Sequence, residues 1–171
     1  MKTIIFDDKL NNETVQVLID GIQQPYEETP ETDIVLYFSS EGGFNHSANM
    51  LIDCVNTLPE EHNLKMVFYW RVYSSAFDIF VKCNCKKIVD RGAVGLVHLS
   101  SRDVGVREIS NDKGSFDNFL LEDTNALNEE YLKWFQDLGF FSRRELKEIS
   151  KGGDIYLNSL RLKKMLSKLK K

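Results

Sequence analysis

The chain has 171 residues, of which 42% are apolar and 28% are charged. This length suffices for one hydrophobic core, and we expect a single domain over residues 1–171. The composition is typical of a globular protein and argues against a fibrous or intrinsically disordered one, and no apolar run is long enough to cross a bilayer. The N-terminus lacks the pattern of a secretory signal, which predicts a cytoplasmic location.

Three cysteines, Cys54, Cys83 and Cys85, form no zinc or thioredoxin motif, so we expect reduced, mostly buried thiols and neither a metal nor a cofactor. The net charge of −4 hides a basic C-terminus, because no acid follows Asp154. The cationic face of a terminal helix explains this segment better than a site for nucleic acid or an acidic membrane, and neither partner is expected. Its basic residues are Arg161, Lys163, Lys164, Lys168, Lys170 and Lys171.

The N-terminal segment has the pattern of a strand followed by a helix. Residues 3–6 predict a short strand, and apolar side chains then recur at helical spacing over residues 15–22. Asn11 or Asn12 is placed to cap this helix. The polar stretch 23–32 predicts a loop.

A β-α-β unit is expected next. Residues 34–38 predict a buried strand that leads to the paired glycines Gly42 and Gly43. A helix follows, with an apolar inner face over residues 51–58, and residues 64–70 predict a second strand. This order predicts a parallel pair of strands joined by a crossover helix. A strand, a glycine turn and a helix N-terminus together present backbone N–H groups that suit an anion or a developing oxyanion.

The remaining segments predict shorter elements up to the C-terminal region. The sequence indicates a short helix over 74–84, strands over 87–89 and 94–99, a hairpin within 102–114, a helix over 127–138 that stops at Gly139, and a helix begun by the capping box of Ser142 and Glu145.

Three polar side chains of the kind that serine hydrolases use lie at the boundaries of these elements. Ser74 or Ser75 follows the strand over 64–70, where a hydroxyl would lie beside the free N–H groups of a helix N-terminus. His98 ends an apolar strand, and Asp154 lies in a late turn. A serine could attack a carbonyl while the imidazole takes its proton and the carboxylate orients the imidazole. Spacing alone does not establish that the fold brings the three together.

Each candidate also has a structural explanation. Either serine would cap a helix, and the glycine pair would allow close packing of a helix on a strand. His98 would be satisfied by a backbone carbonyl, and Asp154 would bind its own backbone in a turn. His46, near the start of the helix after the glycines, is the competing imidazole. His62 is expected in a solvent-exposed loop.

Several segments resemble the proteolytic subunit of the Clp protease, ClpP, a member of the crotonase-like superfamily. Residues 4–15 are similar to its opening strand and helix, and residues 32–43 to its strand ending in Ser-Pro-Gly-Gly. Residues 73–77 fall where the family carries its nucleophile, residues 94–98 where a strand carries its histidine, and residues 153–157 where the third catalytic residue lies. The resemblance implies an α/β fold of repeated β-β-α units, with a mostly parallel sheet flanked by helices.

The resemblance implies that the chain is a serine peptidase that cleaves peptides or unfolded polypeptides. The family's spacing to His98 favours Ser74 as the nucleophile, with Asp154 as the third member of the triad. The backbone N–H groups of Gly43 and Ser75 would form the oxyanion hole. The family also implies assembly into a ring of six or seven identical subunits.

The chain departs from the family pattern close to this site. Glu41 stands where proline is usual, and Tyr73, Ala76, Phe77 and Asp78 make the surroundings of the serine bulkier and more charged. Two alternatives therefore stay open, a catalytically silent ClpP-like scaffold or regulatory subunit and a crotonase-like protein that binds an acyl thioester. The chain also begins almost directly at its first strand, without the loops that engage an ATPase unfoldase ring, which argues against that partner.

Overall fold

The computed structural model describes residues 1–29, 32–59, 61–99 and 116–169, without the side chains of residues 116–124. The hairpin expected within 102–114 lies outside these residues. The chain divides into two compact units, which we name the sheet unit (residues 1–97 and 156–171) and the helical unit (residues 98–155). The expectation that residues 1–171 act as one domain stays a prediction.

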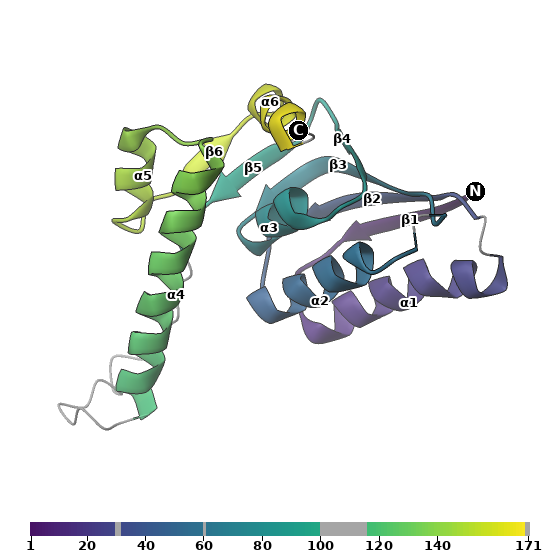
Figure 1. Cartoon of the computed structure of the whole chain (residues 1–171), viewed down its shortest axis with the longest axis horizontal. Coiled ribbons are helices and arrows are strands. Elements are labelled where there is room, and N and C mark those ends of the chain that lie inside the picture. Colours follow the sequence, from purple (N-terminus) through teal and green to yellow (C-terminus); the bar gives the residue numbers. More distant parts are fainter. Residues whose placement is uncertain (30–31, 60, 100–115, 170–171) are drawn as a thin grey trace. The chain divides into compact units, whose positions relative to one another are not determined.

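A mostly parallel β-sheet is the frame of the sheet unit (Figure 1). Its order is β1-β2-β3-β5-β6, and β4 pairs with β3 outside this path. The ladders that join β1 to β2, β2 to β3, and β3 to both β4 and β5 are all parallel, as the β-α-β pattern predicts. The six strands are β1 (Lys2–Asp7), β2 (Ile34–Ser40), β3 (Leu64–Tyr73), β4 (Lys86–Val89), β5 (Val94–Val97) and β6 (Ile155–Leu157).

Helices α1, α2 and α3 lie on the same side of this sheet (Figure 1). Side chains alternate between the two faces of the sheet along each strand. The face that these helices cover buries its apolar residues, whereas Ile5, Tyr37 and Ile88 on the other face are exposed. The helices of the sheet unit are α1 (Asn12–Glu28), α2 (Asn45–Asn56), α3 (Ser75–Lys82) and α6 (Ser159–Leu169), and those of the helical unit are α4 (Phe116–Leu138) and α5 (Arg143–Ile149).

A row of phenylalanines forms the centre of the core. The strand register places Phe6 beside Phe38 and Phe38 beside Phe68. The ring centroids of the first pair lie 5.4 Å apart and those of the second 5.7 Å apart. Phe80 of α3 meets Phe68 edge to face at 5.1 Å, so the row continues from the sheet into the helix layer. Edge-to-face and offset pairs of this kind add to the stability that their buried area provides.

Helix α1 is longer than the sequence pattern predicts. The loop expected over residues 23–32 is wrong for residues 23–28, because α1 continues to Glu28 through Pro25, whereas Thr29 and Thr32 lie outside any helix or strand. Proline removes one backbone hydrogen bond and would normally break a helix, but Pro25 and Tyr26 are buried and continue the apolar stripe that contains Ile22. At the start of the helix, Asn11 is the cap, and its side chain accepts the Thr14 N–H at 2.9 Å.

Helix α3 ends two residues earlier than predicted, at Lys82. The buried side chain of Lys87 donates hydrogen bonds to the carbonyls of Phe80 and Val81 at 2.8 and 3.2 Å. These carbonyls lack partners within the helix, and a cation at this end also interacts favourably with the helix dipole. Lys87 therefore fixes the C-terminal end of α3.

The helical unit confirms two sequence signals. Gly139 has φ of 63° directly after α4, as a glycine that ends a helix should. Ser142 caps α5, where its hydroxyl accepts the Glu145 N–H at 3.3 Å and the Glu145 carboxylate accepts the Ser142 N–H at 2.8 Å. Helix α4 begins earlier than expected, at Phe116 rather than near residue 127.

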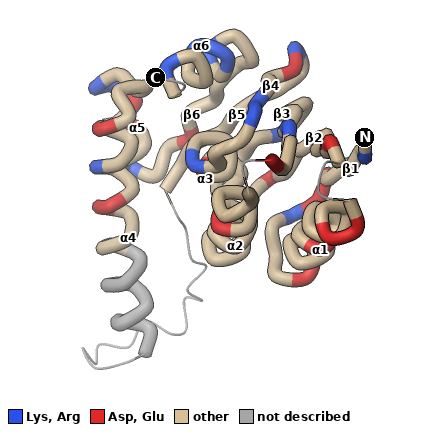
Figure 2. Tube along the Cα trace, turned by 45° about the vertical axis from the view of Figure 1, so that its right-hand side comes forward, with Lys and Arg blue, Asp and Glu red and all other residues tan. Residues whose placement is uncertain are grey.

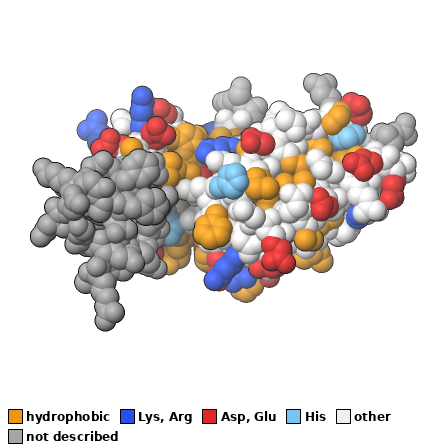
Figure 3. Space-filling model, turned by 90° about the horizontal axis from the view of Figure 1, so that it is seen from below, with side chains coloured by type: hydrophobic (Ala, Val, Ile, Leu, Met, Phe, Trp, Pro, Cys, Tyr) orange, Lys and Arg blue, Asp and Glu red, His pale blue; other side chains and the backbone are white. Residues whose placement is uncertain are grey.

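The charged residues are unevenly distributed over the sheet unit. Acidic residues occur along α1 and basic residues along α6 (Figure 2). Helix α6 also buries Leu162, Met165 and Leu166. The face that carries α1 and α2 shows apolar side chains scattered among acidic and polar ones (Figure 3). No helix in the described ranges has the length and apolar content that crossing a membrane requires.

The phenylalanine row leads to a test of stability. Phe68→Ala is expected to lower the free energy of unfolding by about 3–5 kcal/mol, because it removes a fully buried ring that contacts two others. Val17→Ala, at a 69% exposed position of α1, is the control and should change stability by no more than about 0.5 kcal/mol. Urea unfolding of both variants measures the difference, and equal losses would contradict this account of the core.

Candidate active site

Ser74 joins β3 to α3 in a strained backbone conformation. Its φ of 54° and ψ of −127° lie outside the regions that serine normally adopts. Among the residues that the structure describes, it is the only one other than glycine with a positive φ. Such a conformation costs on the order of 1–3 kcal/mol and is typical of sharp strand-to-helix turns that expose a nucleophile.

Two backbone hydrogen bonds hold Ser74 in this conformation. Its N–H donates to the carbonyl of Leu96 on β5 at 2.8 Å, and its carbonyl accepts the N–H of Phe77 at the same distance. The hydroxyl makes no capping hydrogen bond to α3, although a serine at this position would ordinarily be a helix cap. The Ser74 hydroxyl therefore does not serve as a helix cap, which was the structural explanation for this serine.

Ser75 has the opposite properties. Its side chain is buried, and its hydroxyl donates a hydrogen bond to the carbonyl of Gly43 at 3.2 Å. That hydroxyl fastens the start of α3 to the glycine turn. The two neighbouring serines thus differ in a way that favours Ser74 as the nucleophile.

The turn after β2 packs directly against Ser74. Gly42 has φ of 89°, and a Cβ atom at this position would lie 2.6 Å from the Tyr73 carbonyl oxygen and 2.8 Å from the Ser74 Cβ. Both distances are shorter than non-bonded carbon contacts allow. Only glycine therefore permits this close approach of the turn to the end of β3.

The backbone of Leu10 holds the same turn from the other side. Leu10 donates its N–H to the Gly42 carbonyl at 2.9 Å and accepts the Phe44 N–H at 2.8 Å. A Cβ on Gly43, whose φ is 150°, would collide with the Leu10 carbonyl. The Gly42 N–H donates to the Ser40 hydroxyl at 3.0 Å. No sequence pattern marks Leu10 as part of a site, because it acts through main-chain atoms.

Two N–H groups near Ser74 have no hydrogen-bond acceptor among the described residues. The N–H groups of Gly42 and Phe44 are used as described above, whereas the Gly43 N–H has no acceptor among the described residues. The Ser75 N–H begins α3 and has no intrahelical partner, as for any residue in a first helical turn. Two unpaired donors beside a hydroxyl, one at the positive end of a helix, are the elements of an oxyanion hole.

His98 and Asp154 form a pair within the helical unit. Their Nδ1 and Oδ1 atoms lie 3.2 Å apart, and the side chains are 32% and 47% exposed. The sequence offered a backbone carbonyl as the partner of His98 and the turn itself as that of Asp154, and the structure pairs the two side chains instead. A carboxylate on Nδ1 selects the tautomer whose Nε2 can accept a proton.

Ser74 and His98 belong to different units, and their contact stays a prediction. Along the chain, Leu96, whose carbonyl accepts the Ser74 N–H, precedes His98 by two residues. The competing imidazole, His46, is exposed in the first turn of α2.

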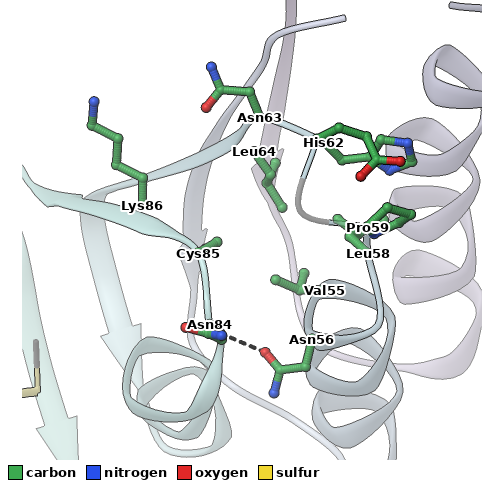
Figure 4. Close-up of a pocket in the computed structure, with 11 residues that line it drawn as sticks. Val55, Asn56, Leu58, Pro59, His62, Asn63, Leu64, Asn84, Cys85 and Lys86 are labelled. Carbon is green, nitrogen blue, oxygen red and sulfur yellow. Dashed lines mark hydrogen bonds between the residues drawn. The ribbon is translucent and has the colours of Figure 1, made fainter. Parts of the chain in front are cut away.

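His62 differs from its expected place in an exposed loop. Its ring stacks on Tyr26 of α1 with centroids 3.8 Å apart, and its buried Nδ1 has no hydrogen-bond partner among the described residues. It lines a cavity of about 650 Å³ where β3 and β4 begin, with Leu64, Cys85 and Lys86 also on the wall (Figure 4). This is the end of the parallel strands opposite Ser74, so His62 is not part of the candidate site.

The three cysteines are free, and they do not resemble nucleophiles. Burial raises the pKa of Cys54 and Cys83 above that of an ordinary thiol, and it raises the pKa of Cys85 to about 11. These groups are therefore protonated at neutral pH. In the described part of the chain, no group of three histidine, cysteine or acidic side chains could hold a metal ion.

A charged cluster that the sequence did not indicate lies beside the glycine turn. Arg71 of β3 contacts the carboxylate of Glu41 at 2.6 Å and that of Asp7 at 3.0 Å. Asp7 also accepts the Ser39 hydroxyl at 2.8 Å. This hydrogen bond is the main reason that the pKa of Asp7 is lowered, with smaller effects from Arg71. The guanidinium lies 4.1 Å above the ring of Trp70.

Comparisons with known proteins do not indicate a function for this chain. A search against protein-family models finds no match to this chain, and neither does a search of curated proteins. The features that can support a function are therefore the strained serine, the two unpaired N–H groups and the histidine–aspartate pair.

The strain at Ser74 predicts an unusual effect of mutation. Ser74→Gly is expected to raise the free energy of unfolding by about 1 kcal/mol, because glycine adopts a positive φ without steric cost and this gain exceeds the entropy it adds to the unfolded chain. Ser75→Ala is the control, and it should lower stability by about 1 kcal/mol through loss of its hydrogen bond to Gly43. Chemical denaturation measures both, and a destabilised Ser74→Gly variant would show that the strain is not there.

The lowered pKa of Asp7 predicts how stability depends on pH. Because folding lowers this pKa, the carboxylate contributes stability at pH values above its ordinary pKa of 3.8, and the contribution is lost as the pH falls through the lower value of the folded state. The difference in unfolding free energy between wild type and Asp7→Asn should therefore be constant near neutral pH and shrink below about pH 4. Denaturation at several pH values tests this, with Asp8→Asn as the control for removing one exposed negative charge.

Proposed function

We propose that the protein is a serine-type hydrolase of the ClpP kind that cleaves peptides or unfolded polypeptides. The observation that carries this proposal is the conformation of Ser74, which is strained, does not cap α3, and lies beside two unpaired N–H groups. A serine that served only the fold would adopt a relaxed cap, because the strain brings no structural gain.

In the first step, the Ser74 hydroxyl oxygen attacks the carbonyl carbon of the peptide bond. His98 accepts the hydroxyl proton on Nε2, and the carbonyl oxygen becomes an oxyanion. The N–H groups of Gly43 and Ser75 donate hydrogen bonds to this oxyanion. Loss of one such donor typically costs about 3–4 kcal/mol of transition-state stabilisation.

The tetrahedral intermediate then collapses to an acyl-enzyme. The carbon–nitrogen bond breaks, and His98 returns its proton to the departing amine. A water molecule gives a proton to His98 as its oxygen attacks the acyl-enzyme carbonyl carbon. The ester bond to the Ser74 oxygen then breaks, and His98 returns the proton to that oxygen, which releases the acid and free Ser74. Asp154 accepts the Nδ1 proton of His98 in a hydrogen bond throughout and stabilises the imidazolium that forms in each half of the cycle.

We also propose the ClpP/crotonase fold and a homo-oligomeric ring, because several sequence segments resemble those of ClpP. The parallel β2-α2-β3 unit, with the glycine turn at the end of β2, supports this choice of fold. Native mass spectrometry tests the assembly, for which we expect six or seven copies of the chain, and a stable monomer would contradict it.

Labelling with a fluorophosphonate probe tests the nucleophile. The wild type is expected to gain one covalent adduct by intact mass, and Ser74→Ala should gain none. Ser75→Ala keeps the Ser74 hydroxyl and is the matched control, with an adduct expected at a reduced or unchanged rate. An unlabelled wild type would favour a silent scaffold, and labelling of Ser74→Ala would show that another residue is the nucleophile.

Labelling of histidine variants tests the base. His98→Ala is expected to lower the labelling rate by about 100-fold or more, because the Ser74 hydroxyl then lacks the group that accepts its proton. The His46→Ala variant distinguishes the competing imidazole, since it should label at the wild-type rate. Equal labelling of His98→Ala and the wild type would count against His98.

A further inference from the structure

We propose that Arg71 is a positioning residue that holds the glycine turn, and with it the Gly43 N–H, in the geometry of an oxyanion hole. This inference rests on the proposed hydrolase function. It adds a role for the cluster of Arg71, Glu41 and Asp7, none of which belongs to the triad or donates to the oxyanion.

The position of Arg71 along the chain makes such a role possible. Arg71 is on β3, three residues before Ser74, which directly follows that strand. The Arg71 guanidinium contacts the Glu41 carboxylate at 2.6 Å. Glu41 directly precedes Gly42 in the turn. One ion pair therefore connects the strand that carries the nucleophile to the turn that carries the donor.

The backbone ladder between β2 and β3 makes only part of this connection. The pairing of β2 with β3 is regular up to Phe38 and Phe68 but resumes only at Ser40 and Val72. One residue of β2 thus faces three of β3, and the ladder is interrupted just before the turn. Within the gap, the Arg71 N–H donates to the hydroxyl of Ser39 at 3.3 Å. Side-chain contacts replace the missing ladder at this point.

The guanidinium is itself held in place. Its second terminal nitrogen contacts Asp7 at 3.0 Å, and Ser39 orients Asp7 through a hydrogen bond of 2.8 Å. The group also packs 4.1 Å above the Trp70 ring, and the side chain is only 24% exposed. Arginine suits this role because its planar fork contacts two carboxylates at once, which a lysine cannot do in the same geometry.

Positioning and stability should respond differently to loss of this cluster. Glu41 is 48% exposed, and ion pairs of this exposure contribute little to folding. Catalysis is more sensitive, because a displacement of about 1 Å at a reacting group can lower a rate on the order of a hundredfold. If Arg71 only stabilised the fold, its loss would lower stability and would not lower the catalytic rate of the folded protein.

The test compares Arg71→Met with Arg91→Met, which removes an exposed arginine elsewhere in the sheet unit. For each variant we would measure the second-order rate of fluorophosphonate labelling and the kcat and KM for p-nitrophenyl acetate. Arg71→Met is expected to lower the labelling rate and kcat by about 10–100-fold with KM within about twofold, and Arg91→Met should match the wild type within about twofold. Arg71→Lys, which keeps the charge, should fall between them.

A double-mutant cycle identifies the partner of Arg71. Glu41→Gln alone should slow labelling, and Glu41→Gln combined with Arg71→Met should be no slower than Arg71→Met, because both changes break the same contact. Glu27→Gln, at an exposed position of α1, is the control for loss of one acidic group. Fully additive effects would overturn the assignment of Glu41 as the partner.

Amide hydrogen exchange at Gly42 and Gly43 distinguishes failure of this inference from failure of the proposed function. Faster exchange in folded Arg71→Met than in Arg91→Met would show that the arginine holds the turn, whatever the activity. Equal exchange and equal labelling in the two variants would overturn the positioning role. A wild type that is not labelled at all would overturn the hydrolase, and the catalytic role of Arg71 with it.

Discussion

The close approach of two chain segments at Gly42 is the constraint on which the candidate site depends. The turn after β2 meets the end of β3 at distances that exclude a Cβ atom, so the glycine backbone lies directly against the strained serine. The Ser75 hydroxyl and the Leu10 backbone also hold this turn through hydrogen bonds. Together these contacts determine which N–H groups near Ser74 have an acceptor and which do not. The chemistry proposed for the site follows from that distribution of donors.

The parallel sheet explains how the protein can maintain such a strained contact. The phenylalanine row across β1, β2 and β3 continues into α3 and fixes the strand and the helix on either side of Ser74. Burying a side chain of this size stabilises a fold by about 1.5–3 kcal/mol, which is comparable to the cost of one strained backbone residue. The burial of these phenylalanine side chains therefore offsets the free-energy cost of the strained backbone at Ser74.

The sequence predicted the parts of the molecule that depend on local pattern. The β-α-β order, the Asn11 cap and the Ser142 capping box follow from the periodicity and from the chemistry of short polar side chains. The end of α1 was missed because the burial of Pro25 and Tyr26 is a tertiary effect that overrides a polar composition. Leu10 and Arg71 were missed for a related reason, since their partners lie more than 25 residues away in the chain and neither residue type marks a site by itself.

The hydrogen bonds between Leu10 and the glycine turn make the candidate site depend on the first ten residues of the chain. Those residues supply no catalytic side chain, although Asp7 contacts Arg71, and they form an edge strand after which the Leu10 backbone binds the glycine turn. Loss of residues 1–10 would therefore remove the main-chain partners of the glycine turn while leaving Ser74, His98 and Asp154 in the molecule.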